Sequence, residues 1–160
     1  MTKALIQMAD RSSPVLFSAA APTEMENVDT AEAVIGAAYR QVLKRNPDAA
    51  GLQEYRPKLE SGSTSAKEIV RDLLHRAEWA GRFIHGRSVP ETVLALYDCV
   101  LARAPDLEGW NHLTAWASRD GWSSVIDSMI DSAEYAQRFG AHSVPGQSMP
   151  GAFAGVSRNV

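Results

Sequence analysis

The amino-acid sequence predicts an all-α protein, a single bundle of about six helices built from two related three-helix halves. One stretch of sequence occurs twice in related form, which indicates an internal repeat. In both copies the apolar residues recur at the spacing of one face of an α-helix. No segment shows the alternation of apolar and polar residues that is typical of a strand, so we expect no sheet.

The repeat relates residues 38–55 to residues 96–113, with a separation of 58 residues. The identical pairs are Tyr39 and Tyr97, Val42 and Val100, Leu43 and Leu101, Arg45 and Arg103, Pro47 and Pro105, Asp48 and Asp106, and Gly51 and Gly109. Farther along the separation becomes 56, where Ala77, Glu78, Arg82 and Phe83 recur as Ala133, Glu134, Arg138 and Phe139. A difference of two residues in one loop explains the change.

Each copy opens with an amphipathic helix that ends at a proline turn. Apolar residues at 35, 38, 39, 42 and 43, and again at 93, 96, 97, 100 and 101, follow the helical period. Pro47 and Pro105 end these helices, because proline disfavours helical geometry in the residue before it. Asp48 and Asp106 follow directly and can cap the next helix. The sequence therefore predicts a tight helix-turn-helix in each half.

The second and third helices of each copy follow the same apolar pattern. Residues 52, 55 and 59 match 110, 113 and 117, and residues 70, 73, 74 and 77 match 126, 129, 130 and 133. Pro57 strains the first copy's second helix. Ser65 and Ser88 each precede a glutamate by three residues, the pattern of a capping box. Gly140 is a natural C-terminal stop after the last short helical segment.

We expect the ends of the chain to lie outside the helical domain. Residues 1–30 have no steady period and predict a flexible N-terminal arm, followed by a helical domain over 31–145. Residues 146–160 are rich in Gly, Pro and Ser, and predict a flexible C-terminal tail. Small residues after an apolar stretch near position 20 resemble a signal peptide, but Asp10 and Arg11 interrupt it, so secretion is not favoured.

Charge and cysteine content exclude several classes of function. The 160 residues carry a net charge of -3 and a pI of about 5.8, so no bulk positive field attracts nucleic acid or an anionic membrane. No apolar run reaches the roughly 18 residues that a membrane span needs. The single Cys99 cannot form an internal disulfide, which agrees with a reducing cytoplasm.

No pattern in the sequence points to catalysis or to a metal or cofactor of the protein's own. The four histidines, at 75, 85, 112 and 142, lack metal-ligand spacing, and there is no phosphate-binding loop or nucleophile elbow. Cys99 lies off the apolar stripe with nothing to activate it, so we expect an inert thiol. Arg45, Arg103, Glu78 and Glu134 recur beside turns, which favours a structural role, with each arginine bound to turn carbonyls or to the capping aspartate.

Aromatic residues that one copy has and the other lacks are candidates for binding a partner. Trp116 replaces Lys58 and Trp122 replaces Ala66, so the shared fold requires neither tryptophan. Such aromatics are common anchors of protein interfaces, and packing within the second half is the alternative interpretation. Two aromatic residues in the terminal arms, Phe17 and Phe153, are further candidates, as parts of segments that order on a partner.

The second copy resembles the linker domain of phycobilisome linker polypeptides. The resemblance covers about 31–146 and rests on a Leu-x-x-Arg-x-Pro turn followed by a Ser-x-Glu-Tyr segment, Phe-Gly and Val-Pro. The residues here that match the closing pattern are Ser132, Glu134, Tyr135, Phe139, Gly140, Val144 and Pro145.

The resemblance implies a non-enzymatic protein that binds phycobiliproteins such as phycocyanin or allophycocyanin. It implies a place in the central opening of stacked phycobiliprotein discs, where a linker contacts the bilins that its partners carry. The implied location is the cytoplasm, at the thylakoid face as part of a phycobilisome.

Two features depart from the family. The usual linker is basic, whereas this chain has a net charge of -3. The turns "LKRNP" and "LARAP" also lack the glycine that often precedes the turn arginine. The first copy equally resembles a repeat of bacterial surface and secreted proteins, so a protein-interaction domain of that kind is the alternative function. An unrelated helical adaptor is a third.

Overall fold

A computed structural model describes residues 22–146, with side chains from residue 30 onward, and this part of the chain is entirely helical. The helices are α3 Pro22–Val42, α4 Ala49–Glu60, α5 Ala66–Leu74, α6 Ala77–Phe83, α7 Val89–Leu101, α8 Leu107–Asp120, α9 Trp122–Ile130 and α10 Ala133–Arg138. The all-α prediction is confirmed. The predicted number of about six helices is wrong, because eight are present over the described residues.

The two additional helices arise where each third helix breaks. Its predicted apolar stripe runs through Ala77 and Ala133, but α5 ends at Leu74 and α9 ends at Ile130. Arg76 and Ser132 then adopt extended backbone angles, with ψ of 148° and 153°, and start the short helices α6 and α10. Apolar spacing continues across both breaks, so periodicity alone did not reveal them.

Helix α3 begins at Pro22, within the segment expected to be an arm. Proline suits the first turn of a helix because its missing amide hydrogen would have no partner there, and its fixed φ already fits. Residues 1–21 and 147–160 lie outside the described residues, so their predicted flexibility stays a prediction. Within the described part, no helix is both long and apolar enough to cross a membrane.

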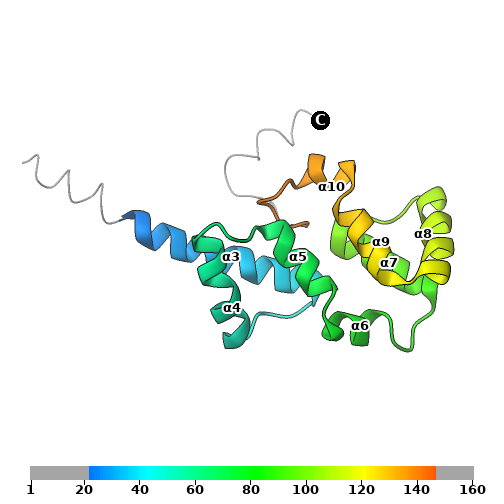
Figure 1. The fold of residues 1–160 in the computed structure, drawn as a ribbon, viewed down its shortest axis with the longest axis horizontal. Helices are drawn as coiled ribbons and strands as arrows, with labels where there is room; N and C mark the ends of the chain where they lie inside the picture. Colours follow the sequence, from blue (N-terminus) through cyan, green and yellow to red (C-terminus); the bar gives the residue numbers. More distant parts are fainter. Residues whose placement is uncertain (1–21, 147–160) are drawn as a thin grey trace, which may run out of the picture.

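The helices form two groups joined through α6 (Figure 1). Helix α3 packs against α4 and α5, whereas α7 packs against α8, α9 and α10. Contacts of α3 with α7 and of α5 with α9 hold the groups together. The division into two related halves as a whole stays a prediction, to which the repeated contacts described below add support.

Helix α7 is the centre of the hydrophobic core, since it contacts helices on several sides. Its buried residues are Thr92, Val93, Leu96, Tyr97, Cys99, Val100 and Leu101. The matched apolar residues of the two copies predict a shared core, and Tyr39, Leu43, Tyr97, Leu101 and Tyr135 are buried in it. Phe83 and Phe139 are instead half-buried, because each ends a short helix and packs from the side on Trp79 or Tyr135.

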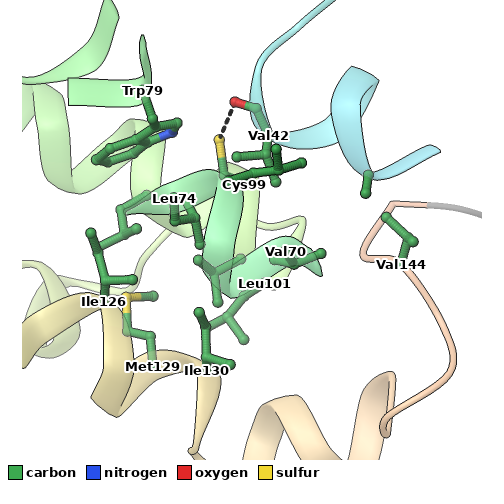
Figure 2. Packing of buried hydrophobic residues seen from close by; sticks show 14 of the residues in the cluster. Val42, Val70, Leu74, Trp79, Cys99, Leu101, Ile126, Met129, Ile130 and Val144 are labelled. Atoms are coloured by element: carbon green, nitrogen blue, oxygen red, sulfur yellow. Dashed lines mark hydrogen bonds between the residues drawn. The ribbon is translucent and has the colours of Figure 1, made fainter. Parts of the chain in front are cut away.

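The expectation that Cys99 lies off the apolar stripe is wrong. Cys99 is fully buried at the contact of α7 with α3, and its Sγ lies 3.6 Å from the carbonyl oxygen of Val42 (Figure 2). Burial raises the pKa of the thiol to about 11, which keeps it protonated at neutral pH. Helix α7 is buried over a wider face than the single apolar stripe in the sequence indicates, and Cys99 lies on the additional part of that face.

The segment after α10 returns to the first group of helices. The amide of Lys67 at the start of α5 donates to the carbonyl of Ala141 at 3.0 Å, and Val144 is only 3 % exposed. Val144 lies among the core residues drawn in Figure 2. The segment that follows α10 therefore binds the start of α5 through Ala141 and adds Val144 to the hydrophobic core.

Candidate partner-binding surface

The repeated motif arginines each clamp a glutamate of the following short helix. Arg45 donates to both carboxylate oxygens of Glu78 at 2.7 Å, joining the end of α3 to α6. Arg103 does the same to Glu134 at 2.7 and 2.8 Å, joining the end of α7 to α10. These hydrogen bonds lower the pKa of Glu78 and of Glu134, so both carboxylates are ionised at neutral pH.

The motif arginines bind turn carbonyls, as expected, but not the capping aspartates. Arg45 donates to the carbonyl of Asn46 and Arg103 to that of Ala104, each at 2.9 Å. Each guanidinium also lies 5.1 Å from the centre of a tyrosine ring, Tyr39 or Tyr97. The carboxylate that each motif arginine binds is therefore that of Glu78 or Glu134 in the following short helix, and not that of the capping aspartate.

The motif aspartates, glycines and prolines shape the turn itself. Asp48 accepts a hydrogen bond from the amide of Gly51 at 2.8 Å and caps α4, and Asp106 caps α8 through Gly109 at 2.7 Å. A Cβ on Gly51 would lie 2.3 Å from the hydroxyl of Tyr39, and one on Gly109 would lie 2.2 Å from that of Tyr97. Pro47 and Pro105 lie in the turns before these caps. The tyrosine hydroxyls therefore require glycine at these positions.

A second arginine in each short helix, Arg82 in α6 and Arg138 in α10, also binds the end of α3 or of α7. Arg82 donates to the carbonyl of Leu43 at 2.8 Å, and Arg138 donates to that of Leu101 at 2.6 Å. Gly140 follows α10 with a positive φ of 63° and donates to the carbonyl of Ala136, as a C-terminal stop requires. All these groups bind within the domain, which gives the motif's charges structural roles.

Trp116 and Trp122 lie on two helices that contact each other, α8 and α9. Both are half-buried and pack against the hydrophobic core, and Trp116 also meets the ring of His112 edge-on at 5.7 Å. Neither is fully exposed, so each combines a packing role with an accessible face. Phe17 and Phe153 lie outside the described residues. Partner binding by all four residues stays a prediction.

Two adjoining hollows open on the second group of helices beside Trp116. One, of about 390 Å³, is lined by Asp106, Glu108 and Gly109, and the other, of about 230 Å³, by Trp116, Ser128 and Ser132. Tyr97, Arg103 and His112 line both. The two hollows together form what we call the α8 pocket.

Sequence reasoning missed this pocket. The sequence predicts only structural roles for Tyr97 and Arg103, and for His112 only that its spacing does not suit a metal ligand. The available signal was the set of positions around Tyr97 where large polar residues of the first copy are replaced by smaller ones in the second. Over the described residues, no group of three or more His, Cys, Asp or Glu could hold a metal ion.

Comparison with known proteins gives a family match over most of the chain. The model of the family described as Phycobilisome Linker polypeptide matches residues 26–148. A phycocyanin-associated 32.1 kDa rod linker polypeptide of Synechocystis sp. is 31% identical over 89% of this chain and 51% of its own length. The linker polypeptide named phycoerythrin class 2 subunit gamma, from Synechococcus sp., is 32% identical over 79% of this chain and 44% of its own.

A third relative, the phycobiliprotein ApcE of Synechococcus sp., is 32% identical over 69% of this chain and 16% of its own length. This chain thus spans about half the length of the first two relatives and less of the third. The matched linker family is structural and non-enzymatic. These relatives do not support the alternative of a bacterial surface or secreted protein.

Proposed function

Because this chain belongs to the phycobilisome linker polypeptide family, we propose that it is a non-enzymatic linker that binds phycobiliproteins in a light-harvesting phycobilisome. The observation that carries the proposal is the family match over 26–148, which includes all the helices from α4 to α10. The repeated clamps of Arg45 with Glu78 and of Arg103 with Glu134 give the rigid framework that a structural linker needs.

The partner is phycocyanin, allophycocyanin or a related phycobiliprotein. The Synechocystis relative is described as phycocyanin-associated, which supports phycocyanin as the first partner to test. The linker has no cofactor of its own and contacts the bilins that its partner carries, with the exposed faces of Trp116 and Trp122 as the contacting rings. Phe17 and Phe153 add contacts from the arms. It acts in the cytoplasm, at the thylakoid face.

The net negative charge of this chain affects which surface of the phycobiliprotein it can bind. With 19 Asp and Glu against 16 Lys and Arg, it meets an acidic disc interior less favourably than a basic linker does. We therefore place its contacts on a basic or neutral part of the phycobiliprotein. Raised salt should then weaken the binding only a little, because Coulomb attraction is a small share of it.

The tryptophan contacts are tested by variants that take the residue of the other copy. Trp116→Lys and Trp122→Ala introduce side chains that the matching positions 58 and 66 already accommodate. Each should weaken phycocyanin binding by about tenfold or more, the scale of an interface hot spot, and should reduce the shift in bilin absorption that binding causes. Affinity is measured by titration of phycocyanin with the linker, followed at the bilin absorption band.

Trp110→Leu is the matched control, because Leu52 stands at the corresponding position and Trp110 is also half-buried. It should bind as the parent does. The helical spectrum and the melting temperature of every variant are measured beside binding. Unchanged affinity in both test variants would remove the two tryptophans from the contact surface.

A further inference from the structure

The first copy fills the space around its motif tyrosine with an arginine. Arg76 lies 3.5 Å from the hydroxyl of Tyr39 and donates to the hydroxyl of Tyr55 and to Glu54, both at 2.7 Å. It also reaches Asp72 at 3.3 Å, and Tyr55 donates to the same carboxylate. The guanidinium carbon lies 5.4 Å from the centre of the Tyr55 ring, close enough for a cation–π contact.

The second copy keeps the motif tyrosine, as Tyr97, but has lost the other four members of this network. Glu54 is replaced by His112, Tyr55 by Leu113, Asp72 by Ser128, and Arg76 by Ser132. The positions correspond at separations of 58 and 56, the same ones that relate the Arg45 and Arg103 clamps. All four replacements line the α8 pocket. The pocket is therefore the space that Arg76 occupies in the first copy.

The buried tyrosine of the second copy lacks the partner that its counterpart has. Tyr97 is only 6 % exposed and lines both parts of the pocket, but its hydroxyl makes no hydrogen bond with any residue that the structure describes. Burial raises its pKa, so the hydroxyl stays protonated and can both donate and accept. The ring of Tyr97 is buried but its hydroxyl is not among the buried atoms, so the hydroxyl is open to the pocket and available to a polar group of a ligand.

The charges and rings of the lining select a flat cation. Asp106, Glu108 and Glu134 carry three carboxylates against one guanidinium, that of Arg103. Arg103 and Arg138 both pair with Glu134, and Glu108 makes no ion pair with a described residue, so three carboxylates face two guanidinium groups and one negative charge is in excess. The rings of His112 and Trp116 add aromatic surface on which a planar guanidinium stacks better than a lysine ammonium, whereas the ring of Tyr97 already has the guanidinium of Arg103 5.1 Å from its centre.

We propose that the α8 pocket receives an arginine side chain of the partner protein, which takes the place that Arg76 fills in the first copy. Leu107, 70% exposed between Asp106 and Glu108 in sequence, supplies an apolar contact at the same end of α8. The inference rests on the proposed linker function only for naming a phycobiliprotein as that partner. The preference of the pocket for a guanidinium depends only on its lining residues.

The pocket is tested with a small probe that needs no phycobiliprotein. The full chain, labelled with nitrogen-15, is titrated with Nα-acetylarginine amide and, as the matched neutral control, with Nα-acetylcitrulline amide. We expect a saturable shift of the Trp116 indole signal with the arginine probe, with Kd in the millimolar range that suits a single side chain. The citrulline probe should bind at least about tenfold more weakly, because it lacks the charge.

Two variants fill the pocket with residues that the fold accommodates at the matching positions. Ser132→Arg places an arginine where Arg76 stands, and Leu113→Tyr places a ring where Tyr55 stands. Both should abolish the probe's shift, and Ser132→Arg should weaken phycocyanin binding at least tenfold. Equal shifts with both probes, no saturable shift in the parent, or full binding in both folded variants would overturn the proposal.

Two other outcomes are distinguishable from these. If the parent shows no shift until Arg158→Gln is introduced, the pocket holds an arginine of the chain's own tail, and the partner inference is overturned. If the probe binds but phycocyanin does not bind the parent, the proposed linker function fails while the guanidinium chemistry of the pocket is upheld.

Discussion

Two residues in the left-handed region, Lys44 and Ala102, stand directly before the motif arginines. Their φ values are 55° and 51°, and each follows the end of a long helix. Glycine adopts this conformation without steric cost, which explains why linkers often have glycine before the turn arginine. In this chain Lys44 and Ala102 adopt the same conformation, although a side chain makes it strained.

Ala102→Gly should therefore stabilise the protein. Relief of the left-handed strain outweighs the greater unfolded-state entropy of glycine, and we expect a gain of about 0.5–1 kcal/mol in the free energy of unfolding. Ala95→Gly in the middle of α7 is the matched control and should lower stability by about 1 kcal/mol. Denaturant unfolding measures both. Equal changes in the two variants would show that the backbone at Ala102 is not strained.

At the scale of single elements, α7 bears most of the packing. Leu101 is 4% exposed, whereas Leu94 on the same helix is 48% exposed. Leu101→Ala should cost about 2–5 kcal/mol because it leaves a cavity in the core, and Leu94→Ala should cost about 0.5 kcal/mol or less. The comparison of the two unfolding midpoints tests this. Similar losses from both variants would contradict the central position of α7.

The contact of α5 with α9 depends on ionised carboxylates. Arg71 donates to Asp127 at 2.9 Å and to Asp131 at 2.6 Å, and Lys67 lies 3.1 Å from Asp131. The hydrogen bond from Arg71, followed by that from Lys67, lowers the pKa of Asp131 from 3.8 to about 2. The stabilising contribution is therefore complete above about pH 4 and is lost as the pH falls toward 2.

Asp131→Asn should remove this part of the pH dependence. We expect the parent's free energy of unfolding to fall more steeply between pH 4 and pH 2 than that of the variant, with the difference reduced by salt, since Asp131 is exposed. Urea unfolding at several pH values in that range is the measurement. Parallel curves for the two proteins would show that the ion pairs contribute nothing to stability.

Most helices were predictable from the sequence, but their breaks were not. The period of apolar residues and the caps at Asp48, Ser88 and Asp106 located the helix starts, and Ser88 with Glu91 forms the full capping box. The break at Arg76 has no such signal, because Arg76 starts α6 without a side-chain cap. Its guanidinium instead makes tertiary hydrogen bonds to residues of α4, which the helical period of the sequence does not show.

At the scale of the whole molecule, the repeated motif consists of residues that are identical in the two copies, whereas the α8 pocket is lined by residues that differ between them. Identity between the copies located the Arg45 and Arg103 clamps, since residues that the fold needs are kept in both. The pocket lies where the second copy has Ser132 in place of Arg76, so its signal in the sequence is a set of differences between the copies rather than a shared motif. The structure adds that the four replaced residues line one hollow.

The most direct test of the linker function is the sedimentation of phycocyanin with and without this chain, followed at the absorption of the bilins. A linker predicts that the bilin absorbance moves to a faster boundary as the chain is added and that the chain is found in that boundary. If the boundary of phycocyanin stays unchanged at every ratio, and the chain sediments alone, this chain does not join phycobiliproteins.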